Sequence, residues 1–277
     1  EQQGLHVVDS IETLLDPTGK TQNLMLTYAV RDGIISHCGE VRSTVIRPRE
    51  EAMDLNDIER PSQYAPYTWE GCVVKIADKI AYLGRDIEDA VRLGILKEDG
   101  KPLQDLLKEL NSYSREPIQS VTNTSIMYPL ITDICRESSP EAGLVLSQSH
   151  INMMDAVMRF NYAHIYKNKR LEVYHAYARL ILESVYKLLR GCYAGTETMN
   201  NIRLLAKDYP TLGRHFEKRM KKFSDSGRLE ADPDEYGNKV IYKISDSEDD
   251  YKKACIDYIA GMTDTYAEKI FGEMTTF

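Results

Sequence analysis

The segment Trp69–Leu93, WEGCVVKIADKIAYLGRDIEDAVRL, decides the fold because it contains no proline and repeats its apolar residues at helical spacing. The apolar positions form one stripe and are Val73, Ile76, Ala77, Ile80, Leu83, Ile87, Ala90 and Val91. The opposite face carries Asp78, Tyr82, Arg85, Asp86 and Asp89. The spacing predicts an amphipathic helix about 35 Å long, which is enough to cross a domain.

The polar face of this helix has two interpretations. Most amphipathic helices turn their charges to water, and Arg85 with Asp89 has the spacing of an ordinary surface ion pair. The carboxylates also stack along one side of the helix, which would suit a bound cation. Helical periodicity alone leaves both interpretations open.

The rest of the chain reads as an all-α protein. The predicted helices cover 4–16, 24–37, 69–92, 102–112, 119–137, 148–162, 170–190, 196–207, 210–223 and 249–274. Asn23 is the expected N-cap of the second helix, which should bury Val30. Residues 39–68 are rich in proline and charge, as an irregular loop would be. Within a second loop at 225–249, KVIYKI at 239–244 alternates and predicts a strand.

The composition of the chain limits the classes of protein to which it can belong. The 277 residues are 42% hydrophobic and 28% charged, which fits one or two globular units. The net charge of −8 argues against a general nucleic-acid coat. No apolar run approaches the ~18 residues of a membrane span, so we expect no membrane partner. The five cysteines show no C-x-x-C spacing, so we expect reduced thiols in a cytoplasmic protein.

One local exception to the acidic character is RHFEKRMKKF at 214–223. Its basic residues are Arg214, His215, Lys218, Arg219, Lys221 and Lys222. Cations interleaved with aromatic rings suit weak binding of single-stranded nucleic acid or of an effector nucleotide. A solvated helix face is the other interpretation, and both stay open.

Three segments of the chain resemble the deoxyguanosine triphosphate triphosphohydrolase (dGTPase) family of the HD phosphohydrolase superfamily. They are LMLTYAVRDGIISHCGEV at 24–41, ADKIAYLGRDIED at 77–89 and DYIAGMTDTYAEKIF at 257–271. They occur in the family's order and span nearly the whole chain. The resemblance implies an all-α fold, with part of an HD-type helical bundle at 1–140 and a phosphohydrolase-associated helical region at 141–277.

The resemblance also implies a site on the 69–92 helix. Asp78 matches a family ligand of a divalent metal, for which Mg²⁺ or Mn²⁺ is the expected ion and another transition metal the alternative. Tyr82 matches the residue that packs on the deoxyribose, and Asp86 the one that accepts a hydrogen bond from its 3′-hydroxyl. These side chains should line one wall of a nucleotide cleft, and a tyrosine beside C2′ would exclude a ribose. Arg85 departs from the family, since many relatives carry histidine there.

Two further residues are candidates for phosphate contacts. Lys79 lies beside the metal-ligand position, and Arg159 lies in MRFNYAHIY at 158–166, which resembles the opening of the phosphohydrolase-associated region. For Lys79 the alternative is an ordinary solvent-facing lysine. For Arg159 it is a structural salt bridge.

None of the chain's six histidines is followed by aspartate. In the family, an early histidine, the His-Asp pair and a catalytic histidine lie upstream of the segment that resembles the start of this chain. The chain also lacks an initiator methionine. We therefore expect the catalytic residues to lie before Glu1 and this portion alone to be inactive.

These features favour a hydrolase of deoxynucleoside triphosphates. Metal-activated water would attack the α-phosphorus, releasing a deoxynucleoside and intact triphosphate. The alternatives are an HD phosphohydrolase of another nucleotide and a non-catalytic module that binds nucleotides or single-stranded nucleic acid. The resemblance further implies a dNTP substrate, a nucleotide effector and a homo-oligomer.

Overall fold

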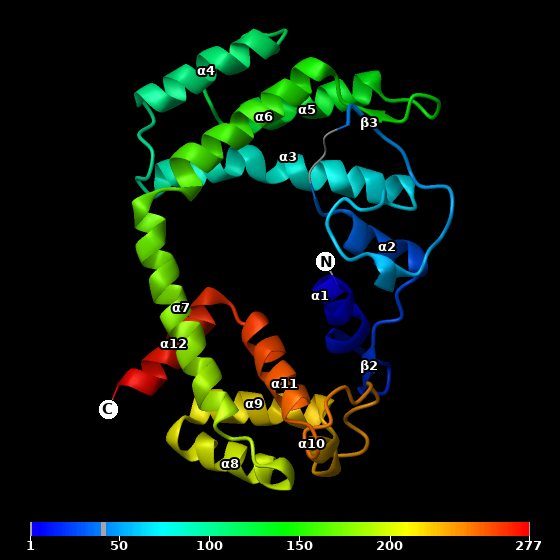
Figure 1. Ribbon diagram of the computed structural model, residues 1–277, viewed down its shortest axis with the longest axis vertical. Coiled ribbons are helices and arrows are strands. Elements are labelled where there is room, and N and C mark those ends of the chain that lie inside the picture. The colour runs from blue at the N-terminus through cyan, green and yellow to red at the C-terminus, as the bar shows by residue number, and fades with distance from the viewer. Residues whose placement is uncertain (1, 40–42, 277) are drawn as a thin grey trace. The chain divides into compact units, whose positions relative to one another are not determined.

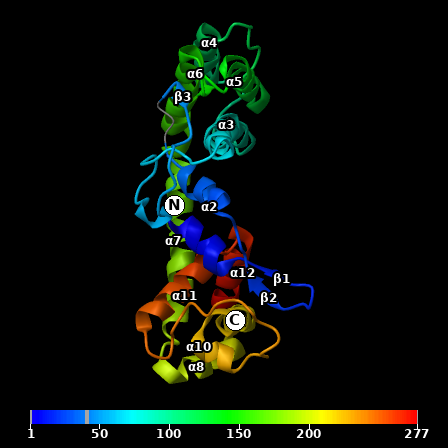
Figure 2. The ribbon, with the colours of Figure 1, turned by 90° about the vertical axis from the view of Figure 1, so that its right-hand side faces the viewer.

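The computed structural model describes residues 2–39 and 43–276, which form two compact units, shown as ribbons in Figures 1 and 2. Unit 1 comprises residues 1–5 and 26–172, and unit 2 comprises residues 6–25 and 173–277. The long segment of unit 1 thus ends at residue 172, and the division at 140 that the sequence suggests between the two family regions stays a prediction. Glu1, together with Glu40 and Val41 of the 24–41 segment, lies outside the described residues.

Helices dominate both units, so the predicted all-α class is confirmed. Unit 1 contains α2 (Tyr28–Ser36), a 3₁₀ turn (Leu55–Asp57), α3 (Trp69–Arg92), α4 (Lys101–Tyr113), α5 (Asn123–Glu137), α6 (Gln148–Asn161) and the π-helical turn η3 (Tyr162–Tyr166). Unit 2 contains the π-helical turn η1 (Val7–Ile11), η4 (Gly195–Glu197), α8 (Thr198–Asp208), α9 (Pro210–Phe223), α10 (Asp225–Leu229), α11 (Glu248–Ala260) and α12 (Asp264–Thr275). The unit boundaries fall within α1 (Gln2–His6) and α7 (Lys169–Arg190).

The strands are short and antiparallel. In unit 2, β1 (Thr13–Leu15) pairs with β2 (Thr21–Asn23) as the hairpin visible in Figure 2. In unit 1, β3 (Val45–Ile46) pairs with β4 (Leu144–Val145).

The helix α3 has the predicted bounds and organises the core of unit 1. The Thr68 side chain accepts a hydrogen bond of 3.0 Å from the Gly71 amide, which caps its first turn. Figure 1 shows α5 and α6 running beside α3, with α4 against α6. The core side chains of α3 are Ile76, Ile80, Leu83, Ile87 and Ala90.

The buried face of α3 differs from the predicted stripe at its N-terminal half. Val73 and Ala77 are exposed, whereas Lys75 and Lys79 are buried. Lysine buries its long aliphatic stem when its ammonium finds partners, so counting apolar residues alone misplaces the face. The prediction was wrong at these two apolar positions.

The second predicted helix, α2, also shows a shifted face. It begins at Tyr28, with Thr27 at the N-cap position in place of Asn23. Val30 is exposed, and Asp32 is completely buried. Asp32 is stabilised there by an ion pair with Arg49, which a pattern of apolar residues does not reveal.

Three predictions near the ends of the chain need correction. The helix expected at 4–16 stops at Ile11, and a strand follows. Residues 239–244 form no strand in the described structure, although Tyr242 bridges to Ser224. The helix expected at 249–274 is broken because Thr263 caps a new helix, its hydroxyl accepting from the Tyr266 amide.

The units have separate hydrophobic cores. In unit 2, α8 and α9 cross closely at Gly213, where an added Cβ would lie 2.4 Å from the Ala206 Cα. The five cysteines are free thiols. Within the described residues, no helix has both the length and the apolarity that crossing a membrane requires.

Candidate functional site

The candidate site lies on the polar side of α3. Tyr82 and Asp86 are half-buried one helical turn apart, and Asp78 is exposed one turn before Tyr82. The Lys79 ammonium lies 5.7 Å from the centre of the Tyr82 ring, within the range of a cation–π contact. Lys79 is 9% exposed, so it is not the solvent-facing lysine of the alternative interpretation. Of the expected stripe Asp78, Tyr82 and Asp86, the last two are thus half-buried, with the buried Lys79 beside them, and the site itself stays a prediction.

Tyr166 of η3 joins this group from a distant part of the sequence. Its hydroxyl donates a hydrogen bond to Asp86 Oδ2. Burial raises the pKa of Tyr166, and the hydrogen bond and negative charge of Asp86 raise it further. The phenol therefore stays protonated and remains a donor near neutral pH. Spacing within the MRFNYAHIY segment at 158–166 does not reveal this contact of Tyr166.

Asn161 fixes the end of α6 against α3. Its side-chain amide is 1% exposed and donates a 3.0 Å hydrogen bond to the Leu83 carbonyl. The π-helical turn that carries Tyr166 begins directly after this anchor. Asn161 also interacts with the Tyr166 hydroxyl, which opposes the rise of its pKa.

Arg159 lies in a different environment. Its guanidinium forms a 2.8 Å ion pair with Glu109 of α4, and both side chains are exposed. It borders a cavity of about 390 Å³ that Phe160 and His164 also line. This contact is the salt bridge that the sequence left as an alternative, and a phosphate role for Arg159 stays a prediction.

The described residues do not suffice for the implied metal. Across 2–39 and 43–276, no group of three or more histidine, cysteine, aspartate or glutamate side chains could hold an ion. Asp78 alone supplies one carboxylate, whereas Mg²⁺ and Mn²⁺ prefer several oxygen ligands. The metal role of Asp78 stays a prediction, and we derive no chemical step through it.

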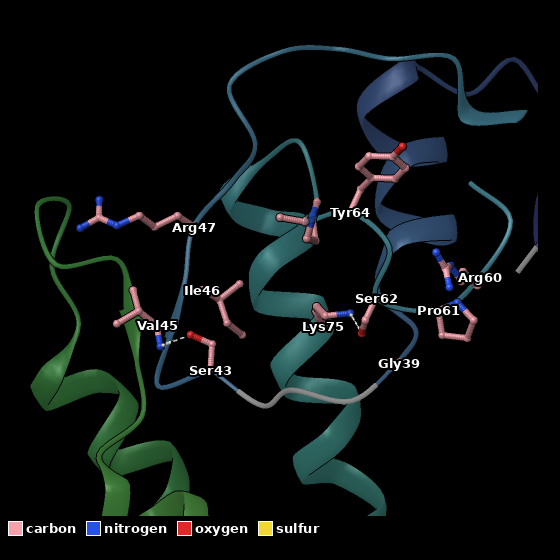
Figure 3. Close-up of a pocket in the computed structure, with 12 residues that line it drawn as sticks. Gly39, Ser43, Val45, Ile46, Arg47, Arg60, Pro61, Ser62, Tyr64 and Lys75 are labelled. Carbon is pink, nitrogen blue, oxygen red and sulfur yellow. Dashed lines mark hydrogen bonds between the residues drawn. The ribbon is translucent and has the colours of Figure 1, made fainter. Parts of the chain in front are cut away.

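A larger cavity of about 950 Å³ opens beside the first half of α3 (Figure 3). Lys75 reaches into it and donates to the carbonyls of Ser36, His37 and Cys38 at 3.2, 3.2 and 2.7 Å. Arg47 points away and donates to the Glu141 carbonyl. Since Lys75 and Arg47 serve structural contacts, we assign this cavity no ligand.

The basic run at 214–223 lies on α9, and three of its cationic side chains contact other residues of the chain. Lys221 forms a 2.9 Å ion pair with Glu217, and Lys222 donates at 2.6 Å to the Thr13 hydroxyl. Arg219 lies over the rings of Phe223 and Tyr258. These contacts reduce the charge offered to a partner, and nucleic-acid or effector binding by this run stays a prediction.

Comparison with known proteins covers both units. Residues 226–273 match the sequence profile of the phosphohydrolase-associated domain. A deoxyguanosinetriphosphate triphosphohydrolase-like protein of Clostridium perfringens strain 13 is 27% identical over 251 residues, 91% of this chain and 54% of that protein. Proteins with the same description from Clostridium perfringens strain SM101 and Rickettsia bellii are 31% and 25% identical over 58% and 90% of this chain.

The chain spans about half the length of these relatives, since it covers 54%, 40% and 61% of the three proteins. The resemblance inferred from the sequence is nevertheless confirmed: most of this chain is similar to deoxyguanosinetriphosphate triphosphohydrolase-like proteins, and its C-terminal part matches the phosphohydrolase-associated domain.

Proposed function

We propose that this chain forms the sugar-binding wall of an enzyme that hydrolyses dGTP or a related deoxynucleoside triphosphate to deoxynucleoside and triphosphate. The observation that carries the proposal is the half-buried pair Tyr82 and Asp86, one turn apart on α3, in the segment that resembles the dGTPase family. The similarity to triphosphohydrolase-like proteins supports the reaction class.

Each residue of the stripe has a chemical task in this proposal. The Tyr82 ring packs on the sugar and leaves no room for a 2′-hydroxyl, so deoxyribose is preferred. The Asp86 carboxylate accepts a charge-assisted hydrogen bond from the 3′-hydroxyl. Lys79, beside Tyr82, attracts the phosphate oxygens of the same nucleotide. Asp78 would offer one carboxylate to a divalent metal, and such a metal would supply charge neutralisation at the phosphate oxygens.

The test uses the complete gene product that contains these 277 residues, incubated with dGTP and Mn²⁺. We expect triphosphate as the inorganic product, and a clear preference for dGTP over GTP in kcat/KM. Tyr82→Ala should reduce that preference, and Asp86→Asn should lower kcat/KM by about tenfold or more. Asp89→Asn, on the same helix and paired with Arg85 and Arg92, is the matched control and should leave both parameters unchanged.

Other products decide against the proposal. Release of phosphate or pyrophosphate would indicate a phosphohydrolase of another nucleotide. Nucleotide binding without turnover in the complete product would favour the non-catalytic alternative.

A further inference from the structure

The Asp86 carboxylate is oriented by a residue far away in the sequence. Tyr166, 80 positions later, donates to Asp86 Oδ2. Within the described residues this is the one hydrogen bond that the Asp86 side chain makes. Asp86 is half-buried and Tyr166 is 44% exposed, and their hydrogen bond is the protein contact that orients the carboxylate.

Two contacts that precede Tyr166 hold its turn against the core of unit 1. Asn161 hydrogen-bonds to the Leu83 carbonyl before the turn, and Ile165, 6% exposed, packs into the core. The π-helical turn η3 follows Asn161, contains Ile165 and ends at Tyr166. Single π-helical turns occur frequently at functional sites, where they redirect a side chain.

We propose that Tyr166 is a positioning residue of the sugar site: it engages one oxygen of Asp86 and so presents the other oxygen to the 3′-hydroxyl of a deoxynucleotide. The inference rests on the proposed function. A carboxylate has acceptor capacity on both oxygens, so one donor on Oδ2 leaves Oδ1 available. The raised pKa of Tyr166 keeps the phenol a donor throughout the neutral range.

The measurement compares dGTP with 2′,3′-dideoxyGTP, which differs only in lacking the 3′-hydroxyl. The readout is the ratio of the two kcat/KM values for the complete gene product. Tyr166→Phe removes the hydroxyl but keeps the ring, and we expect it to lower this ratio about fivefold. A purely structural role would lower both kcat/KM values together and leave the ratio unchanged.

Tyr162→Phe is the matched control. Tyr162 lies in the same turn, is exposed and sits under the Lys167 ammonium, 4.5 Å from its ring centre. The ratio should keep its wild-type value in this variant. Equal losses in Tyr162→Phe and Tyr166→Phe would overturn the inference, because the turn alone would then matter.

The two proposals fail in different ways. If the wild type prefers dGTP, Asp86→Asn removes the preference and Tyr166→Phe retains it, then the role of Tyr166 is wrong and the sugar site stands. If the wild type shows no preference for the 3′-hydroxyl, the proposed function itself is wrong and this inference falls with it.

Discussion

The ammonium of Lys75 on α3 donates a 2.7 Å hydrogen bond to the carbonyl of Cys38, just beyond the end of α2. The same ammonium reaches the carbonyls of Ser36 and His37. The last carbonyls of a helix lack partners within the helix and carry partial negative charge. Lys75 therefore satisfies this helix end from a neighbouring helix.

Replacing Lys75 with methionine should destabilise this contact. The variant keeps an apolar stem but removes the ammonium donor of the Ser36 and His37 carbonyls, while the Cys38 carbonyl keeps the Ser62 amide as a donor, so we expect a loss of about 1–3 kcal/mol. Urea unfolding, with hydrogen exchange of α2 amides as a local probe, measures the effect. Lys108→Met, in an exposed pair with Asp105, should change stability by less than about 0.5 kcal/mol. Equal losses in both variants would contradict the capping role.

Breaking the buried ion pair of Asp32 and Arg49 should lower the free energy of unfolding more than Lys75→Met does. Burial lowers the pKa of Arg49, but the hydrogen bond and charge of Asp32 outweigh it and raise the pKa. Asp32→Ala leaves this guanidinium uncompensated, so we expect a loss of about 3–5 kcal/mol in unfolding free energy. Arg49→Met in the same protein should recover part of that loss. Glu98→Ala, at an exposed site, is the comparison, and a similar effect there would rule out the ion-pair explanation.

Glu273 should make unit 2 acid-sensitive. Its carboxylate accepts from the Thr211 and Leu212 amides at 2.9 and 3.1 Å, at the start of α9. Burial raises the pKa of Glu273, but these hydrogen bonds together lower it by more than burial raises it. The pKa therefore falls below its usual value of 4.5. Its stabilising effect is present above that value and disappears as pH falls through the lowered pKa.

The sign of this effect can be measured in Glu273→Gln. The wild type should lose stability more steeply than this variant between about pH 5 and pH 3, as followed by urea midpoints. Glu268→Gln, at an exposed position of α12, should follow the wild-type curve. Parallel curves for the wild type and Glu273→Gln would contradict the assignment.

Two glycines should respond in opposite directions to alanine. A Cβ at Gly213 would lie 2.4 Å from Ala206 Cα and 2.6 Å from its nitrogen, so Gly213→Ala should cost about 1–3 kcal/mol. Nothing lies within 4 Å of a Cβ at Gly272, so Gly272→Ala in α12 should stabilise by about 0.5–1 kcal/mol. Thermal unfolding distinguishes the two, and a stabilised Gly213→Ala would show that α8 and α9 separate freely.

Local signals were sufficient for the bounds of α3 but not for all of its contacts. The apolar period and the absence of proline predict the observed bounds, and the structure adds the Thr68 cap at the first turn. The apolar period does not show that the ammonium of Lys75 has carbonyl partners. It therefore placed Val73 on the buried face, whereas the structure buries Lys75 and exposes Val73. Likewise, the sequence pattern placed Thr263 in the middle of the last predicted helix. In the structure Thr263 caps a new helix and so divides the predicted one.

The candidate site shows the same division between local and distant information. Helical spacing suffices to bring Tyr82 and Asp86 together, because residues four apart lie on one face. The contribution of Tyr166 depends on how α6 packs on α3, which no spacing within either segment encodes. A contact across 80 residues needs the tertiary structure.

The π-helical turn η3 makes the Tyr166 contact depend on residue count as well as residue type. A π-helical turn holds one residue more than an α-helical turn. Inserting one further residue with ordinary helical winding between Asn161 and Tyr166 would swing the phenol by about 100° around the axis. Such an insertion would uncouple it from α3 as completely as losing the tyrosine, so the number of residues at this point constrains the site as strictly as their identity.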